Sequence, residues 1–109
     1  MDEQVDRGVT IIIGLIESLK DKGDDYYNKK DYESAINNYI AALYTVYDAF
    51  TEEELLTLYT ANILTALYRK LAISYEEYGD EEKGDKYTTM LKDILLRIEE
   101  RKINKEIKE

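Results

Sequence analysis

The most regular feature of the sequence is a stripe of apolar positions near its start. From Val5 to Tyr26 the stripe advances by alternate steps of four and three residues, which is the spacing of one face of an α-helix. The pattern predicts a first helix over residues 5–28. Gly23 lies on this stripe, and a glycine inside a helix costs about 1 kcal/mol relative to alanine. We therefore expect a neighbouring helix to approach closely at Gly23.

Three further apolar residues, Ile11, Ile13 and Leu15, lie beside this stripe and widen the apolar face of the helix. A wide apolar face on a helix indicates that something packs against it. Two interpretations are open for these residues: contact with the last helix of the same chain, or a surface for self-association.

The second and third helices are bounded by residues that suit helix ends. Asp31 can accept backbone amides as the N-cap of a helix over residues 32–49. Thr51 and Glu54 have the spacing of a capping box, which predicts a third helix over residues 52–78. Because no glycine or proline enforces the break between these helices, one bent continuous helix is the alternative.

The third helix is expected to end at Gly79, since glycine readily adopts the left-handed conformation that follows many helices. Asp80 then suits the N-cap of a fourth helix over residues 81–104. The pattern predicts an all-α fold of four long antiparallel helices in two helical hairpins, close to a four-helix bundle. A chain of 109 residues is expected to form a single domain.

The stretch from Gly23 to Leu43 carries a characteristic spacing of small and aromatic residues. Tyr26 follows Gly23 by three positions, Ala35 comes nine residues later, and Tyr39 comes four after that. This spacing resembles the tetratricopeptide repeat, a helical hairpin that binds other proteins.

The second half of the chain resembles the same repeat at Ala72, Tyr75 and Gly84. The equivalent residues Tyr26 and Tyr75 are 49 positions apart, whereas the family repeats about every 34 residues. The extra residues lengthen the second and third helices, which favours two long hairpins over a regular solenoid.

The resemblance implies a binding groove lined by the first helix of each hairpin. Lys20 fits one position of the clamp with which such proteins hold a partner's terminal carboxylate, but Asp24 stands where asparagine is needed, so we do not predict that mode. The alternative interpretation is that the groove positions are ordinary solvent-facing residues. Carried over by position, the partner-binding residues are Glu17, Lys20, Asp24, Tyr27, Ala66, Arg69, Ile73 and Glu76.

Residues 31–43 also resemble the second helix of a MIT domain, a three-helix bundle that binds helical tail peptides. The fourth predicted helix, with its own cap and apolar stripe, has no counterpart in that comparison. We therefore rank the tetratricopeptide-like interpretation first.

The residue types argue against catalysis. The chain has no histidine and no cysteine, so the usual general bases and nucleophile–base pairs are missing. The acidic runs at residues 24–25 and 76–82 lack the ordered spacing of a calcium loop, and we interpret them as solvated surface. We expect no enzyme activity, no cofactor and no metal site.

The charge of the chain bears on its partners. Residues 1–82 carry 7 basic and 18 acidic side chains, residues 83–109 carry 8 and 6, and the formal net charge is −9. Such a surface repels phosphate backbones, so nucleic acid is not expected as a partner, whereas a basic patch on a protein would be attracted.

The length of the hydrophobic runs and the character of the N-terminus bear on where the protein is located. The longest apolar run, residues 9–16, is too short to span a membrane, and an acidic start is unlike a signal peptide. We expect a cytoplasmic protein with no membrane partner. The abundance of Glu, Lys, Ile and Tyr is compatible with a thermophile.

Together these patterns predict a non-catalytic protein–protein interaction module, an adaptor or scaffold that binds a protein segment. The alternatives are a structural subunit that forms a homodimer or joins a larger complex through its first helix, and a MIT-like binder of helical tail peptides.

Overall fold

The computed structural model describes the backbone of residues 2–108 and the side chains of residues 8–57 and 59–104. The part of the chain that it describes contains four α-helices and one short 3₁₀ turn, and no strand. The predicted all-α fold of two helical hairpins is confirmed. The elements are α1 (Asp2–Asn28), α2 (Tyr32–Ala49), η1 (Glu54–Leu56), α3 (Leu58–Tyr78) and α4 (Glu81–Lys108).

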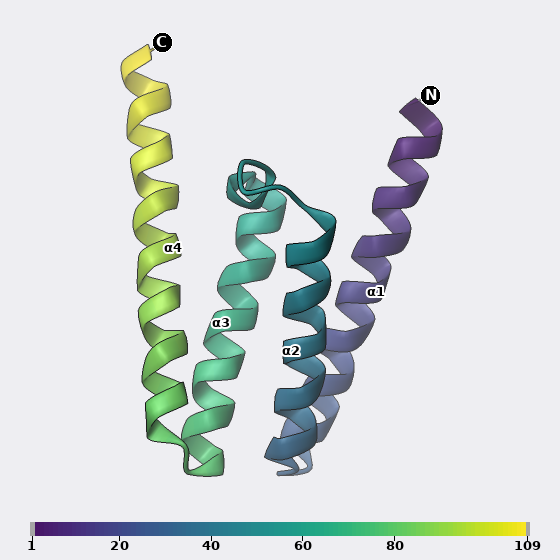
Figure 1. Cartoon of the computed structure of the whole chain (residues 1–109), viewed down its shortest axis with the longest axis vertical. Helices are drawn as coiled ribbons and strands as arrows, with labels where there is room; N and C mark the ends of the chain where they lie inside the picture. The colour runs from purple at the N-terminus through teal and green to yellow at the C-terminus, as the bar shows by residue number, and fades with distance from the viewer. Residues whose placement is uncertain (1, 109) are drawn as a thin grey trace.

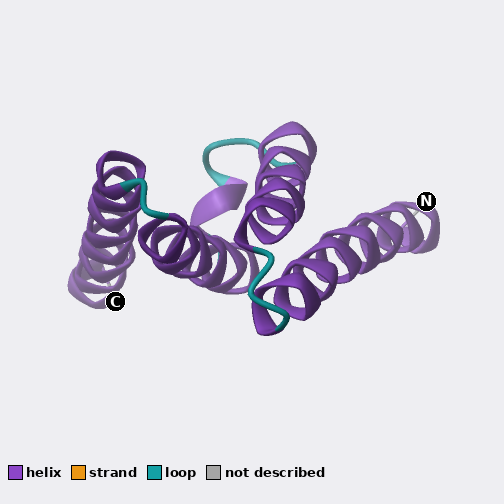
Figure 2. Cartoon of the chain, turned by 90° about the horizontal axis from the view of Figure 1, so that it is seen from below, coloured by secondary structure: helices purple, strands orange, loops and turns teal. Residues whose placement is uncertain are grey.

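The helices alternate in direction and form a row in chain order, as Figure 1 shows. Contacts join α1 to α2, α2 to α3, and α3 to α4, so each hairpin packs on the other through its inner helix. The principal extents of 46 × 33 × 19 Å describe a broad, thin molecule. Viewed from the hairpin-turn end in Figure 2, α1 and α4 stand at opposite ends of the row.

This arrangement corrects one interpretation of the first helix. The predicted contact of α4 with Ile11, Ile13 and Leu15 is wrong, because α2 and α3 separate α1 from α4 (Figures 1 and 2). Ile11 is 72% exposed and Leu15 is 51% exposed. The physical reason is that each hairpin stacks on the other as a layer, so the two outer helices never close into a ring.

The two hairpin turns have the same backbone geometry, although the residue with a positive φ is a lysine in one and a glycine in the other. Gly79 follows α3 with a φ of 102°, and Lys30 occupies the equivalent place after α1 with a φ of 65°. In both turns the next residue donates its amide back five positions: Asp31 to the Tyr26 carbonyl and Asp80 to the Tyr75 carbonyl, each at 2.9 Å. These are the bonds of a Schellman turn.

Each of these turns is followed at once by an N-cap. Oδ1 of Asp31 accepts the amide of Ser34 at 3.2 Å, and Oδ1 of Asp80 accepts the amide of Lys83 at 3.1 Å. Both caps were expected from the sequence, and they fix where α2 and α4 begin.

The start of the third helix differs from the prediction. The capping box forms, with the Thr51 amide donating to Glu54 at 2.9 Å and the Glu54 amide donating to the Thr51 hydroxyl at 3.2 Å. It begins the 3₁₀ turn η1 rather than an α-helix, and Thr57 is extended, with a ψ of 153°. The helix therefore begins at Leu58 instead of residue 52, and α2 and α3 are separate helices.

The core lies along α2 and α3, which are packed on both sides. At Gly23 of α1, a Cβ atom would overlap the ring of Tyr39, whose Cδ1 and Cζ atoms would be 2.6 and 2.9 Å away. This confirms the predicted close approach at Gly23. On the other side of α2, the hydroxyls of Tyr47 and Tyr68 form a short hydrogen bond. The buried core includes Ile16, Ala35, Tyr39, Leu43, Val46, Leu64, Leu67, Leu71, Tyr75 and Ile94.

The outer helices are longer than the inner ones. Helices α1 and α4 have 27 and 28 residues, whereas α2 and α3 have 18 and 21. Since both hairpin turns lie at one end of the molecule, the extra length of α1 and α4 projects at the other end, next to both chain termini (Figure 1). None of the described helices is long and apolar enough to cross a membrane.

Candidate functional site

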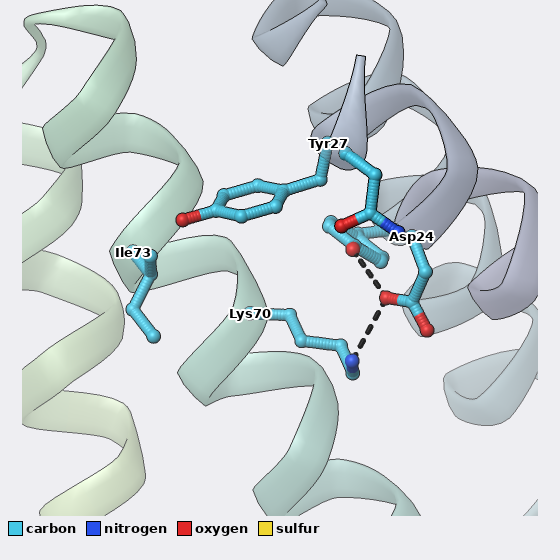
Figure 3. Close-up of a pocket in the computed structure, with 6 residues that line it drawn as sticks. Asp24, Tyr27, Lys70 and Ile73 are labelled. Atoms are coloured by element: carbon cyan, nitrogen blue, oxygen red, sulfur yellow. Dashed lines mark hydrogen bonds and ion pairs between the residues drawn. The ribbon is translucent and has the colours of Figure 1, made fainter. Parts of the chain in front are cut away.

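The first and third helices run in the same direction and are separated by a hollow of about 390 Å³. Its floor includes Tyr39 from α2. Figure 3 shows Tyr27 extending from α1 toward α3, with Ile73 facing it and Lys70 below. The hollow is lined by Asp24, Tyr27, Asn28, Tyr39, Lys70 and Ile73.

Asp24 connects three helices at this hollow. Its Oδ1 atom accepts a hydrogen bond from the Tyr39 hydroxyl at 2.5 Å and is 2.8 Å from Nζ of Lys70, as the dashed lines in Figure 3 mark. The side chains of Asp24 and Lys70 are each 33% exposed. A half-exposed ion pair of this kind adds little stability by itself, and both charged groups remain accessible to a ligand.

The tyrosines of the hollow are held neutral. Burial raises the pKa of the Tyr39 hydroxyl well above its ordinary value of 10, and the hydrogen bond to Asp24 raises this pKa further. Burial also raises the pKa of Tyr27, with smaller contributions from Glu77 and Tyr32. The ring of Tyr27 makes an edge contact with Tyr32, with 5.4 Å between the ring centroids. The hollow thus offers neutral hydroxyl groups on aromatic walls.

A second hollow of about 240 Å³ follows the first between the same two helices. Glu17 and Lys20 line it from α1 and form an ion pair of 2.9 Å. The hydrogen bond to Glu17 raises the pKa of Lys20, so Lys20 stays cationic. Helix α3 contributes Tyr59, Asn62, Ile63 and Ala66. We call the two hollows together the α1–α3 groove.

Most of the residues expected on this face lie in the groove. Glu17, Lys20, Asp24 and Tyr27 line it from α1, and Ala66 and Ile73 line it from α3.

Two of the expected residues lie elsewhere on α3. Arg69 is exposed and lines neither hollow. Glu76 lies toward α4, because a Cβ atom on Gly84 would be 3.1 Å from Cγ of Glu76.

The groove also contains residues that the sequence reasoning missed. Lys70 takes the place expected for Arg69; both residues have helical spacing from Ala66 and Ile73, so no signal in the sequence distinguishes them. The ring of Tyr39 lies in the core, and its hydroxyl reaches the groove.

A different cleft of about 450 Å³ lies between α3, α4 and η1. Its walls are mainly apolar, including Leu56, Leu64 and Ile94, and an exposed ion pair of 3.1 Å joins Arg97 to Asp93 at its edge. The described part of the chain has no cluster of three or more carboxylates arranged to hold a metal ion. The polar groups of the α1–α3 groove include two ion pairs and the hydroxyls of Tyr27 and Tyr39.

No family model matches this chain, and the comparisons with curated proteins and with solved structures also give no match.

Proposed function

We propose that this protein is a non-catalytic interaction module, a tetratricopeptide-like adaptor or scaffold that binds a segment of another protein in the α1–α3 groove. The observation that supports the proposal most strongly is that side chains of α1 and α3 line two hollows between the same two helices. Glu17, Lys20, Asp24 and Tyr27 occur there at alternate steps of three and four residues, opposite Ala66, Lys70 and Ile73.

The groove suits an extended or helical segment with both apolar and basic side chains. Tyr27 and Ile73 offer apolar surface, and Ile73 is 40% exposed. Asp24 and Glu17 offer carboxylates on the α1 side, each paired with a lysine of the groove, and the molecule as a whole has a net charge of −9. Complementary charge would increase the association rate of a basic segment and select against acidic ones.

Position-specific crosslinking in the source cell tests this proposal. A photoreactive phenylalanine analogue replaces Tyr27 in the groove or, as a control, Tyr44, which is 61% exposed. Tyr44 contacts the ring of Tyr47 on the side of α2 away from the groove. We expect one polypeptide to crosslink at Tyr27 and not at Tyr44. Equal labelling at both positions, or none at Tyr27, would contradict groove binding.

A separate observation, exposed apolar residues on α1, supports a second candidate function. Ile11 and Leu15 leave an apolar strip exposed on α1, on the side away from the groove. Burying such a strip is favourable by about 25 cal/mol per Å² of apolar surface. We propose as the alternative that the protein is a structural subunit that associates with itself through α1; of the three residues considered for this role, Ile13 points to the opposite side of α1 from this strip, because residues two apart on a helix face nearly opposite ways.

A further inference from the structure

The cleft between α3, α4 and η1, which we call the α3–α4 cleft, is separate from the groove. Its volume of about 450 Å³ is within the range of small-molecule sites, which are concave and mostly apolar with a few polar groups. Two of the residues that line it belong to the core, since Leu64 is 1% exposed and Ile94 is 7% exposed. The cleft is therefore an indentation that reaches the core, and not a row of side chains on an open helix face.

The walls of the cleft come from one face of α4 and from η1. On α4, residues at helical spacing between positions 90 and 97 line the cleft. The turn η1 contributes Leu55 and Leu56, which pack partly buried against the core, and it lies at the end of α3 away from the hairpin turns (Figure 1). Nη1 of Arg101 donates to the Glu53 carbonyl at 3.3 Å. This bond ties α4 to the chain just before η1 and so connects two walls of the cleft.

Two phenol hydroxyls supply the buried polar groups of the cleft. Tyr47 of α2 and Tyr68 of α3 both line it, and their hydroxyls are hydrogen-bonded to each other. Burial raises the pKa of both phenols, so both keep their protons at neutral pH. Asp93 raises the pKa of Tyr68 slightly and Arg97 lowers it slightly. Since both of these charged residues line the cleft from α4, the hydroxyl of Tyr68 lies within electrostatic range of it.

This pair of hydroxyls has one hydrogen more than it uses. Each phenol carries one O–H donor, and the bond between Tyr47 and Tyr68 uses only one of the two hydrogens, whichever oxygen donates. Within the described part of the chain, no side chain or carbonyl accepts the second hydrogen. A buried donor without an acceptor costs free energy. A molecule in the cleft with an acceptor oxygen would satisfy this donor.

The rings that carry the two hydroxyls are held by neighbouring rings. Tyr47 makes an edge contact with Tyr44 at a centroid distance of 6.5 Å, and Tyr68 packs against Tyr87 at 6.4 Å. Tyr68 is also 6% exposed. A donor that is fixed before a ligand arrives loses little freedom on binding. The spare hydrogen is therefore a preorganised feature of the cleft.

The charges in the cleft disfavour an anion. Two acidic side chains, Glu52 and Asp93, and one basic side chain, Arg97, line it, which leaves a net charge of −1. Nε of Arg97 is already paired with Asp93 at 3.1 Å, and Glu52 has no ion pair within the described part of the chain. A carboxylate in the cleft would be repelled, whereas an uncharged oxygen acceptor would not.

We propose that the α3–α4 cleft binds a small uncharged molecule with an apolar body and an acceptor oxygen, such as an aromatic ketone. The oxygen accepts the spare hydrogen of the Tyr47–Tyr68 pair, and the apolar body packs against Leu56, Leu64 and Ile94. This site goes beyond the proposed adaptor function and is independent of the α1–α3 groove.

The methyl signal of Met90 in an NMR spectrum tests the proposal. Met90 lines the cleft and is one of two methionines in the chain, so an isotope-labelled methionine methyl group reports occupancy, and Met90→Leu identifies its signal. The probes are 2-acetylnaphthalene, an uncharged ketone, and 2-naphthoate, which has the same rings and a carboxylate. We expect the ketone to shift the Met90 signal to saturation and the carboxylate to bind at least about tenfold more weakly.

A double substitution tests the role of the hydroxyls. Tyr47→Phe combined with Tyr68→Phe removes both hydroxyls and keeps both rings, whereas either single substitution leaves one hydroxyl free to donate. Only the double variant should bind the ketone more weakly, by about two- to tenfold. Tyr59→Phe combined with Tyr78→Phe, at two exposed sites, is the matched control and should bind like the parent.

Three results would each overturn the proposal. They are a Met90 signal that the ketone does not shift, equal affinity of the parent for the two probes, and ketone binding by the Tyr47 and Tyr68 double variant that equals the parent's. The comparison of the two probes uses the parent chain alone, so it decides the matter even if the double variant fails to fold. Groove binding is unaffected by any of these results.

Discussion

At the scale of single residues, the contact between Gly23 and Tyr39 organises the first hairpin. The ring of Tyr39 lies against the backbone of α1 at Gly23, and its hydroxyl donates to Asp24 one residue further on. Tyr39 is only 2% exposed, so its ring is packed within the core. The absence of a side chain at position 23 therefore sets the distance between α1 and α2, and with it the position of Asp24 in the groove.

Gly23→Ala is expected to destabilise the protein by about 2 kcal/mol, because the added methyl group overlaps a buried ring that must shift to accommodate it. Gly14→Ala is the matched control. Its Cβ would meet no atom within 4 Å, so the gain in helix propensity should stabilise the protein by about 0.5–1 kcal/mol. Urea unfolding at low protein concentration measures both. Equal effects of the two substitutions would contradict the packing described at Gly23.

At the scale of elements, the two hairpins end their first helices with the same turn but with unequal residues. Lys30 has a positive φ in the first hairpin, as Gly79 has at the equivalent position of the second. For a residue with a side chain, the left-handed conformation costs about 1–2 kcal/mol. The first hairpin thus holds a local strain that the second avoids.

Lys30→Gly should relieve this strain and stabilise the protein by about 0.5–1 kcal/mol, after allowance for the greater freedom of glycine in the unfolded chain. Lys29→Gly, at a neighbouring position without a positive φ, should destabilise it. Thermal unfolding followed by circular dichroism gives the melting temperature of each variant for comparison with the parent. A lower melting temperature for Lys30→Gly than for the parent would refute this account of the turn.

The elements also show how far the sequence predicts the structure. The caps at Asp31 and Asp80 and the stop at Gly79 act within one or two turns of chain, so their patterns predicted the helix ends well. The capping box at Thr51 formed but began a 3₁₀ turn, because a local signal identifies a chain reversal without specifying which helical geometry follows it.

The candidate site was predicted in part for a similar reason. Helical spacing placed Glu17, Lys20, Asp24 and Tyr27 on one face, and the structure brings them to one groove. Spacing alone does not say where each face of α3 points. That depends on how one hairpin packs on the other, and this non-local information decided between Arg69 and Lys70.

At the scale of the whole molecule, buried tyrosines make stability depend on alkaline pH. Burial is the main cause of the raised pKa of Tyr39, Tyr47, Tyr68, Tyr75 and Tyr87, relative to an ordinary value of 10. Above about pH 10 the unfolded chain releases protons that the folded chain retains. The free energy of unfolding should therefore be independent of these groups below pH 10 and fall as the pH rises above it.

A pH titration that follows tyrosinate absorbance and helical circular dichroism together checks this expectation. The five buried tyrosines should ionise only as the helices unfold. Ionisation of all 11 tyrosines near pH 10 with the helices intact would show that the phenol groups are not buried as described.

The central claim is that the α1–α3 groove binds a protein segment, and calorimetric titration with a synthetic peptide tests it most directly. The peptide is the segment crosslinked at Tyr27, titrated into the parent chain, Ile73→Lys and Tyr44→Lys. We expect Ile73→Lys to weaken binding by about tenfold or more, since a charge replaces apolar surface inside the groove, and Tyr44→Lys to bind like the parent. Equal affinity of all three proteins for the peptide would contradict the claim.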